Sequence, residues 1–149
     1  MSPVLNVERV VPGTPERVWT AWTTPDGLAG WWWRQLPGTT YEVDARVGGR
    51  YRIDSPPAGI GVRGEYTEVS APHRFAASWI WVEDGVDGAA EHIVVTFDPH
   101  PDGTKLTVTH TGPWEDEQPV EQYRQGWTDV LEALHALLTS RDTSSTRTG

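Results

Sequence analysis

The chain has 149 residues, with 21 acidic and 12 basic side chains, a formal net charge of −9 and no cysteine. This length suits one domain with a sizeable core. The negative charge argues against general nucleic-acid binding, and the lack of cysteine excludes disulfides, thiolate metal sites and a cysteine nucleophile. Because no apolar run approaches the roughly 18–20 residues of a membrane span and the start has no signal-like segment, we expect a cytoplasmic protein that does not bind a membrane.

A strand and two short helices are predicted first. Residues 4–11 have the apolar content of a strand. Thr14 followed by Pro15 is typical of a helix start, with Thr as the cap and Pro in the first position. The same signal at Thr24 starts a second short helix, which we expect to run into the three consecutive tryptophans at 31–33.

From residue 40 the apolar residues recur with the period of two that is typical of strands. Six strands are predicted, at residues 40–47, 50–53, 62–69, 74–82, 91–97 and 105–110. The acidic, glycine-rich segment 83–90 is predicted as a loop.

A long helix is predicted from Pro119 to about Leu138. Its apolar residues fall on one broad stripe: Val120, Tyr123, Trp127, Val130, Leu131, Leu134, Leu137 and Leu138. Gly126 lies inside this helix, where Gly costs roughly 0.5–1 kcal/mol relative to Ala. We therefore expect another part of the chain to approach the helix closely at Gly126. Residues 141–149 are predicted to form a disordered tail after a single domain at 1–140.

The width of this stripe requires a large partner surface. We predict an α+β fold in which a bent antiparallel sheet of about seven strands wraps around the long C-terminal helix. The two short helices after the first strand would close one end.

Tryptophan is unusually frequent, with nine residues in the chain. Five of them lie close together in the sequence: Trp19, Trp22, Trp31, Trp32 and Trp33. Most of the nine fit a tryptophan-rich core, but such a concentration is also typical of a surface that grips a ligand or partner.

These elements and several short motifs resemble the START / Bet v 1-like (SRPBCC) superfamily with its helix-grip fold. Within it, the chain is similar to the branch named after the C-terminal domain of the activator of the ninety-kilodalton heat-shock-protein ATPase. The resemblance covers about residues 4–138. Its motifs are Val-Trp-Thr-Ala-Trp-Thr at 18–23, Leu-Ala-Gly-Trp-Trp at 28–32, Asp-Ala-Arg-Val-Gly-Gly at 44–49, Gly-Glu-Tyr-Thr-Glu-Val at 64–69 followed by Pro72, the segments 94–97 and 103–108, and Gly126-Trp127 with Leu131 and Leu134.

The resemblance is specific for fold and much less so for function. It implies a cavity between sheet and long helix in which superfamily members bind lipids, sterols, polyketides or other hydrophobic molecules. Some members cyclise aromatic polyketides, and one group gives bacteria resistance to the enediyne antibiotics they make. Many members of this branch have no assigned activity.

On such a fold, the candidate ligand-binding residues are mostly aromatic. They are Trp31, Trp32, Tyr51, Trp79, Trp81, His110, Trp114, Tyr123 and Trp127. Aromatic walls suit planar ligands, since ring pairs contribute on the order of 0.5–1.5 kcal/mol beyond area burial. The alternative is that these rings fill the interior and leave no cavity.

Two polar features have a functional and a structural interpretation. Asp44 and Arg46 share one strand face and are either a polar anchor at the cavity mouth or an ion pair that positions the following two glycines. His110 either contacts a ligand or is a satisfied buried histidine. No metal-ligand spacing and no known catalytic motif occurs, so no catalytic residue, metal or cofactor is predicted.

The first hypothesis is a cytoplasmic, non-catalytic binding protein for a hydrophobic, aromatic or polyketide-like molecule. It would act as a monomer or weak homodimer in secondary-metabolite biosynthesis or antibiotic self-resistance. The second hypothesis is a polyketide cyclase-like enzyme that works by positioning its substrate. The third is a chaperone-cofactor-like protein-interaction module, which ranks last because the chain has only the one domain that the resemblance covers.

Overall fold

A computed structural model shows the fold of the chain and describes residues 4–114 and 117–148, with side chains up to Thr139. Seven strands form one antiparallel sheet in the order β1-β7-β6-β5-β4-β3-β2. Their bounds are β1 Val4–Val11, β2 Thr40–Val43, β3 Arg50–Ser55, β4 Ile60–Ser70, β5 Arg74–Glu83, β6 Val86–His100 and β7 Gly103–Thr111. The helices are α1 Pro15–Thr23, α2 Pro25–Ala29 and α3 Gln118–Thr148, with a short 3-10 turn at Pro56–Ala58.

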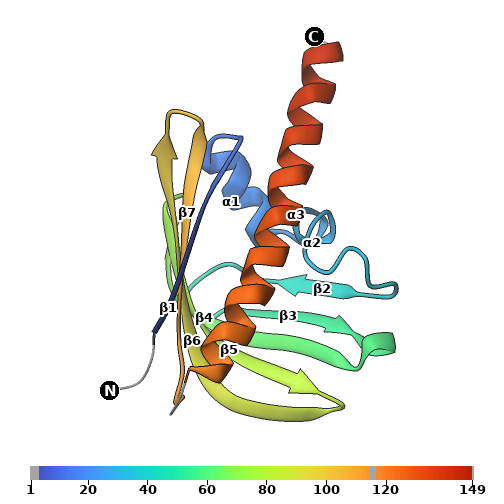
Figure 1. Cartoon of the computed structure of the whole chain (residues 1–149), viewed down its shortest axis with the longest axis vertical. Helices are drawn as coiled ribbons and strands as arrows, with labels where there is room; N and C mark the ends of the chain where they lie inside the picture. Colours follow the sequence, from blue (N-terminus) through green and yellow to red (C-terminus); the bar gives the residue numbers. More distant parts are fainter. Residues whose placement is uncertain (1–3, 115–116, 149) are drawn as a thin grey trace.

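The sheet curves around α3, with α1 and α2 near the half of the molecule where the C-terminus leaves it (Figure 1). This arrangement confirms the predicted α+β helix-grip fold, with seven strands, two short helices after the first strand and a long C-terminal helix. None of the helices among the described residues is long and apolar enough to cross a membrane.

The two short helices begin where their caps predict. The Thr14 side chain accepts a hydrogen bond from the Arg17 N–H at 3.2 Å, and the Thr24 side chain accepts one from the Gly27 N–H at 3.0 Å. The second helix ends at Ala29, so the three tryptophans lie in the turns after it instead of inside it.

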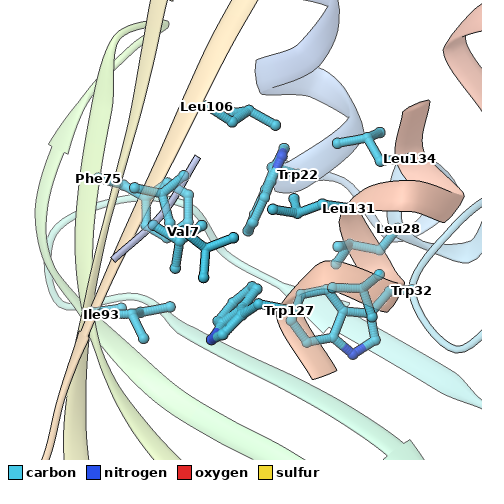
Figure 2. Close-up of a cluster of buried hydrophobic side chains, with 14 of the residues drawn as sticks. Val7, Trp22, Leu28, Trp32, Phe75, Ile93, Leu106, Trp127, Leu131 and Leu134 are labelled. Atoms are coloured by element: carbon cyan, nitrogen blue, oxygen red, sulfur yellow. The ribbon is translucent and has the colours of Figure 1, made fainter. Parts of the chain in front are cut away.

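The apolar stripe of α3 packs into the concave side of the sheet. Most of the predicted residues are buried: Val120, Trp127, Val130, Leu131, Leu134 and Leu138, with Tyr123 and Leu137 half-buried. Figure 2 shows part of this cluster, in which Trp127, Leu131 and Leu134 lie with side chains of the sheet and the short helices. One continuous core therefore joins α3, the sheet and both short helices.

Two predicted strand boundaries are wrong. β2 ends at Val43 instead of continuing to residue 47, because Gly48 adopts a φ of 84° and the chain turns there. The predicted loop at 83–90 is mostly a hairpin, since β6 begins at Val86. Asp84 and Gly85, with φ of 50° and 79°, form the tight turn between Glu83 and Val86, and Asp-Gly is a common signature of such turns.

The C-terminal helix is longer than predicted. α3 continues to Thr148, so the predicted end near Leu138 is wrong. Ser, Thr and Arg do not break a helix, and no Gly or Pro occurs between Trp127 and Thr148. The disorder predicted for 141–149 stays a prediction about the chain in solution, and Gly149 lies outside the described residues.

Candidate ligand-binding site

A cavity of about 550 Å³ lies between the first half of α3, the β5–β6 hairpin and the turn after α2. Its lining residues are Trp32, Trp33, Trp79, Trp81, Glu83, Glu91, Trp114, Pro119, Gln122, Tyr123, Gly126, Trp127 and Val130. The volume falls within the roughly 300–1,000 Å³ that is typical of small-molecule sites. Because Glu83, Gln122 and Gly126 are exposed, the cavity opens to solvent along one side.

The indole walls come from four separate segments, which are the turn after α2, strand β5, the residues after β7 that include Trp114, and α3. Trp79 and Trp81 lie two residues apart on β5 and both face the cavity, as strand alternation predicts. Trp79 packs against Trp127 of α3 with ring centroids 5.3 Å apart. Trp33, with a φ of 52°, meets Trp81 edge to face at 5.7 Å. These ring contacts fix flat surfaces on which a planar molecule could stack.

Gly126 marks the point where α3 leaves the cavity open. An added Cβ at this position would meet no atom within 4 Å. The prediction of a close approach at this glycine is therefore wrong, and the missing side chain adds room to the cavity instead. Glycine lowers the stability of the helix at this position, but any larger side chain would stand beside the cavity.

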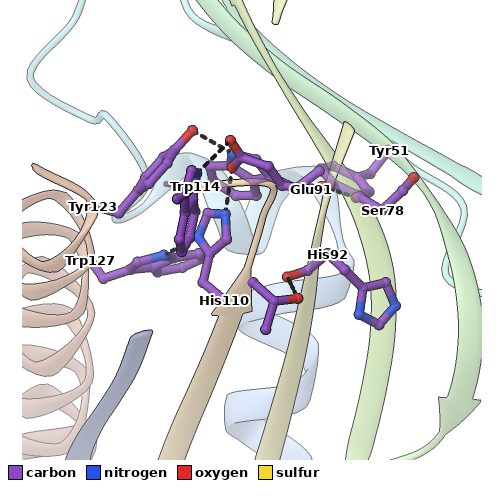
Figure 3. A network of polar contacts seen from close by, with 10 residues as sticks. Tyr51, Ser78, Glu91, His92, His110, Trp114, Tyr123 and Trp127 are labelled. Atoms are coloured by element: carbon purple, nitrogen blue, oxygen red, sulfur yellow. Dashed lines mark hydrogen bonds and ion pairs between the residues drawn. The ribbon is translucent and has the colours of Figure 1, made fainter. Parts of the chain in front are cut away.

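Glu91 is the polar centre of the wall (Figure 3). Its side chain is 10% exposed, and one carboxylate oxygen lies 2.7 Å from Nε2 of the fully buried His110. The other oxygen accepts a hydrogen bond from Nε1–H of Trp114 at 3.2 Å. A carboxylate is thus held in place among aromatic rings.

The protonation state of His110 follows from its two partners. Trp127 Nε1–H, which can only donate, points at His110 Nδ1 at 3.0 Å. Nδ1 therefore accepts, and the ring proton sits on Nε2 and is donated to Glu91. The geometry selects the neutral imidazole.

Burial changes the pKa values of two residues of this network. Burial lowers the pKa of His110 below its ordinary value, against the opposing hydrogen bond and charge of Glu91. Burial, with the negative charge of Glu91, raises the pKa of Tyr123. Both side chains are therefore neutral near pH 7, and neither offsets the charge of Glu91.

One indole donor of the cavity wall has no acceptor. Nε1 of Trp32 is buried without a hydrogen-bond partner among the described residues. A buried unpaired donor costs about 1–3 kcal/mol. The described protein groups therefore do not satisfy every hydrogen-bond donor of the cavity wall.

Six of the nine predicted ligand-binding residues line the cavity. These are Trp32, Trp79, Trp81, Trp114, Tyr123 and Trp127. Trp31 lies deeper, fully buried, with its indole N–H donated to the Ala21 carbonyl at 3.0 Å. His110 lies directly behind the wall, as a satisfied buried histidine. Tyr51 is buried, does not line the cavity and donates its hydroxyl to the Ser78 carbonyl at 2.7 Å.

Asp44 and Arg46 do not belong to this cavity. They follow β2 in a loop, so the premise of a shared strand face is wrong. Their side chains pair with each other at 2.9 Å on an exposed surface. The loop folds back on itself because the Gly49 N–H donates to the Arg46 carbonyl at 2.8 Å, and a Cβ on Gly49 would lie 2.0 Å from the Asp44 carbonyl oxygen. This geometry favours the structural interpretation of the ion pair.

The sequence interpretation missed several wall residues, of which Glu91 matters most. Glu91 precedes Ile93, Val95 and Phe97 at a period of two, and these three are buried on the inner face of β6. A charged residue that continues a buried face is a signal that was available in the sequence. Gly126 carries a signal as a glycine inside a predicted helix, although the close approach inferred from it is wrong, and Trp33 and Val130 have no comparable signal.

The sequence is similar to that of a known protein family. A sequence model of the family described as "Activator of Hsp90 ATPase homolog 1-like protein" matches residues 12–139. The chain belongs to this family. The predicted resemblance to that branch is confirmed. No curated protein matches the chain significantly.

Solved structures of similar proteins have the same fold. Protein MLL2253 from Mesorhizobium loti is 24% identical, with a TM-score of 0.77 over 93% of this chain and 98% of that one. Protein CV1439 from Chromobacterium violaceum is 29% identical, with a TM-score of 0.72 over 91% and 96%. DynU16, a protein of the dynemicin biosynthetic locus, is 24% identical, with a TM-score of 0.76 over 95% of this chain and 48% of that one.

The described part of the chain offers no metal site. Within residues 4–114 and 117–148, no three His, Asp or Glu side chains come together so as to hold a metal ion. Glu91 has indole and imidazole N–H groups as partners, which are donors and not further ligands. What the site can do chemically is therefore to stack rings, accept hydrogen bonds and hold a negative charge.

Proposed function

We propose that this chain is a cytoplasmic binding protein for a hydrophobic, aromatic small molecule. The ligand would lie in the cavity between α3 and the β5–β6 hairpin. The observation that carries the proposal is the cavity of about 550 Å³, with walls built largely from six tryptophans and one tyrosine. Such a site buries flat apolar surface and adds ring stacking to the area term.

The fold of the related structures supports this proposal at the level of architecture. DynU16, with a name that places it in the dynemicin biosynthetic locus, has the same fold, although 24% identity carries no more than that. Polycyclic polyketides are therefore a reasonable class to test first, together with flavonoids, sterols and fatty acids.

Intrinsic tryptophan fluorescence provides the test, because six of the nine tryptophans line the cavity. We expect one class of the panel to quench fluorescence saturably at micromolar concentration. Gly126→Leu should abolish this binding, since its Cβ would meet no atom within 4 Å and the rest of the side chain would occupy space beside the cavity wall. Thr128→Leu, an exposed position of the same helix that does not line the cavity, is the matched control and should bind normally.

The proposal fails if no class saturates and ligand at high concentration does not raise the melting temperature. It also fails if Gly126→Leu and Thr128→Leu bind alike, because the ligand would then lie elsewhere. In either case the tryptophans would be core or interface residues.

A cyclase-like enzyme is a second candidate, and the position of Glu91 is the observation that favours it. A carboxylate in a largely apolar cavity could accept a proton from a bound substrate. Both nitrogens of His110 are already hydrogen-bonded, so Glu91 would be the group that touches the substrate. Mass spectrometry of each bound compound after incubation, with Glu91→Gln as the comparison, distinguishes conversion from binding alone.

A further inference from the structure

The cavity wall carries negative charge, which a site for a purely apolar aromatic ligand would not need. Two of its lining residues, Glu83 and Glu91, are acidic, and none of the described lining residues is Lys, Arg or His. Glu83 lies at the exposed rim, where it accepts a hydrogen bond from the Trp81 indole at 3.3 Å. The cavity is therefore apolar over most of its wall and anionic where it is polar.

The inner carboxylate is not neutralised by its neighbours. The donors that hold Glu91 are all uncharged, because Trp114 donates an indole N–H, Tyr123 donates its hydroxyl and His110 is fixed in its neutral form by Trp127 (Figure 3). A carboxylate with two oxygens has about four acceptor positions, and these three donors fill only part of them. Burying a charge without a counter-charge is costly, and a positive ligand would remove that cost.

The rings around Glu91 are suited to a cation as well. Tyr123 lies against Trp114 with centroids 5.7 Å apart and against Trp79 at 6.0 Å. Trp79 in turn packs on Trp127. A cation within about 6 Å of such ring centroids is attracted to their faces, most strongly where water is excluded. The net charge of −9 would also draw cations toward the molecule.

We propose that the ligand of this cavity carries a positive charge, as a hydrophobic or aromatic molecule with a protonated amine or a quaternary ammonium group. The cationic end lies against the Glu91 carboxylate among Trp79, Trp114 and Tyr123, and the apolar body occupies the open part beside Gly126. This inference rests on the proposed function, because it specifies the chemistry of the same site. Fatty acids, which would bring a second carboxylate to Glu91, are the poorest ligands of the panel.

Three fluorescent probes of similar aromatic character test the inference. Thioflavin T carries a positive charge, its analogue without the ring N-methyl group is neutral, and anilinonaphthalene sulfonate is anionic. We expect the wild-type protein to bind thioflavin T about ten-fold or more tightly than the neutral analogue, and to bind the anionic probe most weakly. Glu91→Gln should remove most of this preference, so that thioflavin T and the neutral analogue bind with similar affinity. Glu83→Gln, at the rim, should reduce the preference for thioflavin T less than Glu91→Gln does.

The two proposals fail in different ways. If the neutral or anionic probe binds as tightly as thioflavin T, and Gly126→Leu still blocks that binding, the cavity binds ligands but the charge inference is wrong. The same holds if Glu91→Gln folds normally and keeps the full preference. If none of the three probes binds in a manner that Gly126→Leu abolishes and Thr128→Leu preserves, the charge inference fails, and the proposed function fails with it only if no compound of the larger panel binds in that manner either. The wild-type comparison of the three probes needs no variant and decides the charge question even if Glu91→Gln does not fold.

Discussion

Two glycines show that α3 packs closely in one half of the molecule and borders an open cavity in the other. In the packed half, where Leu131, Leu134 and Leu138 enter the core, Gly30 lets the turn after α2 approach α3. A Cβ on Gly30 would lie 2.8 Å from Leu137 Cδ2. In the open half, where Tyr123 and Trp127 of α3 face the cavity, a Cβ on Gly126 would meet nothing within 4 Å. A glycine beside a wide apolar stripe can therefore mean close packing or open space.

The side chains of the two halves explain this difference. In the packed half, the aliphatic side chains of α3 lie in one continuous cluster with side chains such as Leu106 and Trp22 (Figure 2). The open half is walled by large rings, of which Trp114 is held by a hydrogen bond to Glu91 and Trp79 by its contact with Trp127. Rings whose positions are fixed by contacts behind them cannot collapse onto one another, so space remains between them.

The largest expected effect comes from breaking the packed half. Leu134→Ala removes a fully buried side chain and should lower the free energy of unfolding by about 2–5 kcal/mol. Urea denaturation followed by circular dichroism measures this change. Ala136→Gly, at an exposed position of the same helix, should cost only about 1 kcal/mol. A loss of similar size in both variants would show that this half is not tightly packed.

Breaking the polar wall of the open half should have an intermediate effect. His110→Phe keeps a ring of similar size but leaves the Trp127 N–H and one oxygen of Glu91 without their partner. We expect a loss of about 1–3 kcal/mol in unfolding free energy. His92→Phe, on the exposed face of the neighbouring strand, is the control and should be close to neutral. An unchanged stability of His110→Phe would contradict the hydrogen-bond network described above.

The same histidine gives the stability a pH dependence. Burial lowers the pKa of His110 in the folded chain, so below the unfolded pKa of about 6.5 the unfolded state binds the proton more readily. Stability should therefore fall as the pH drops through that value, and level off below the folded pKa of His110. Unfolding free energies measured across this range should show a steeper fall in the wild type than in His110→Phe. Parallel curves would mean that His110 does not contribute.

The smallest expected effect is a gain in stability, which tests the difference between the two glycines. Gly126→Ala should raise the unfolding free energy by about 0.5–1 kcal/mol, because the position is helical and the methyl group meets no neighbour. Gly30→Ala should gain less or lose stability, since its methyl group would press on Leu137. Melting temperatures of both variants check this order, and a loss at Gly126 would reveal a neighbour there.

The sequence predicts the fold well because the fold depends on local signals. Thr14 and Thr24 act as caps through short-range hydrogen bonds, and the stripe of α3 depends only on helical spacing. The motifs of the family then fix the order of strands. The helix end near Leu138 was predicted wrongly because Ser, Thr and Arg neither favour nor stop a helix strongly.

The site is harder to predict because it depends on which residues meet across the chain. Trp31, Trp32 and Trp33 are identical in type and adjacent, yet they lie in the core, in the cavity wall and at its mouth, respectively. Their separation follows from the turn after α2, where Trp33 adopts a positive φ. His110 was a candidate from its strand face, but only its partners show that it lies behind the wall and that Glu91 faces the cavity.

The most direct test of the open half is the response of the nine indole N–H signals in a two-dimensional NMR spectrum of the labelled protein. The protein would be titrated with the tightest-binding compound of the panel. A ligand in this cavity should shift the signals of the six tryptophans of the wall, at positions 32, 33, 79, 81, 114 and 127, and should change those of Trp19, Trp22 and Trp31 little. Shifts concentrated in Trp19, Trp22 and Trp31, or spread evenly over all nine, would contradict a ligand site in this cavity.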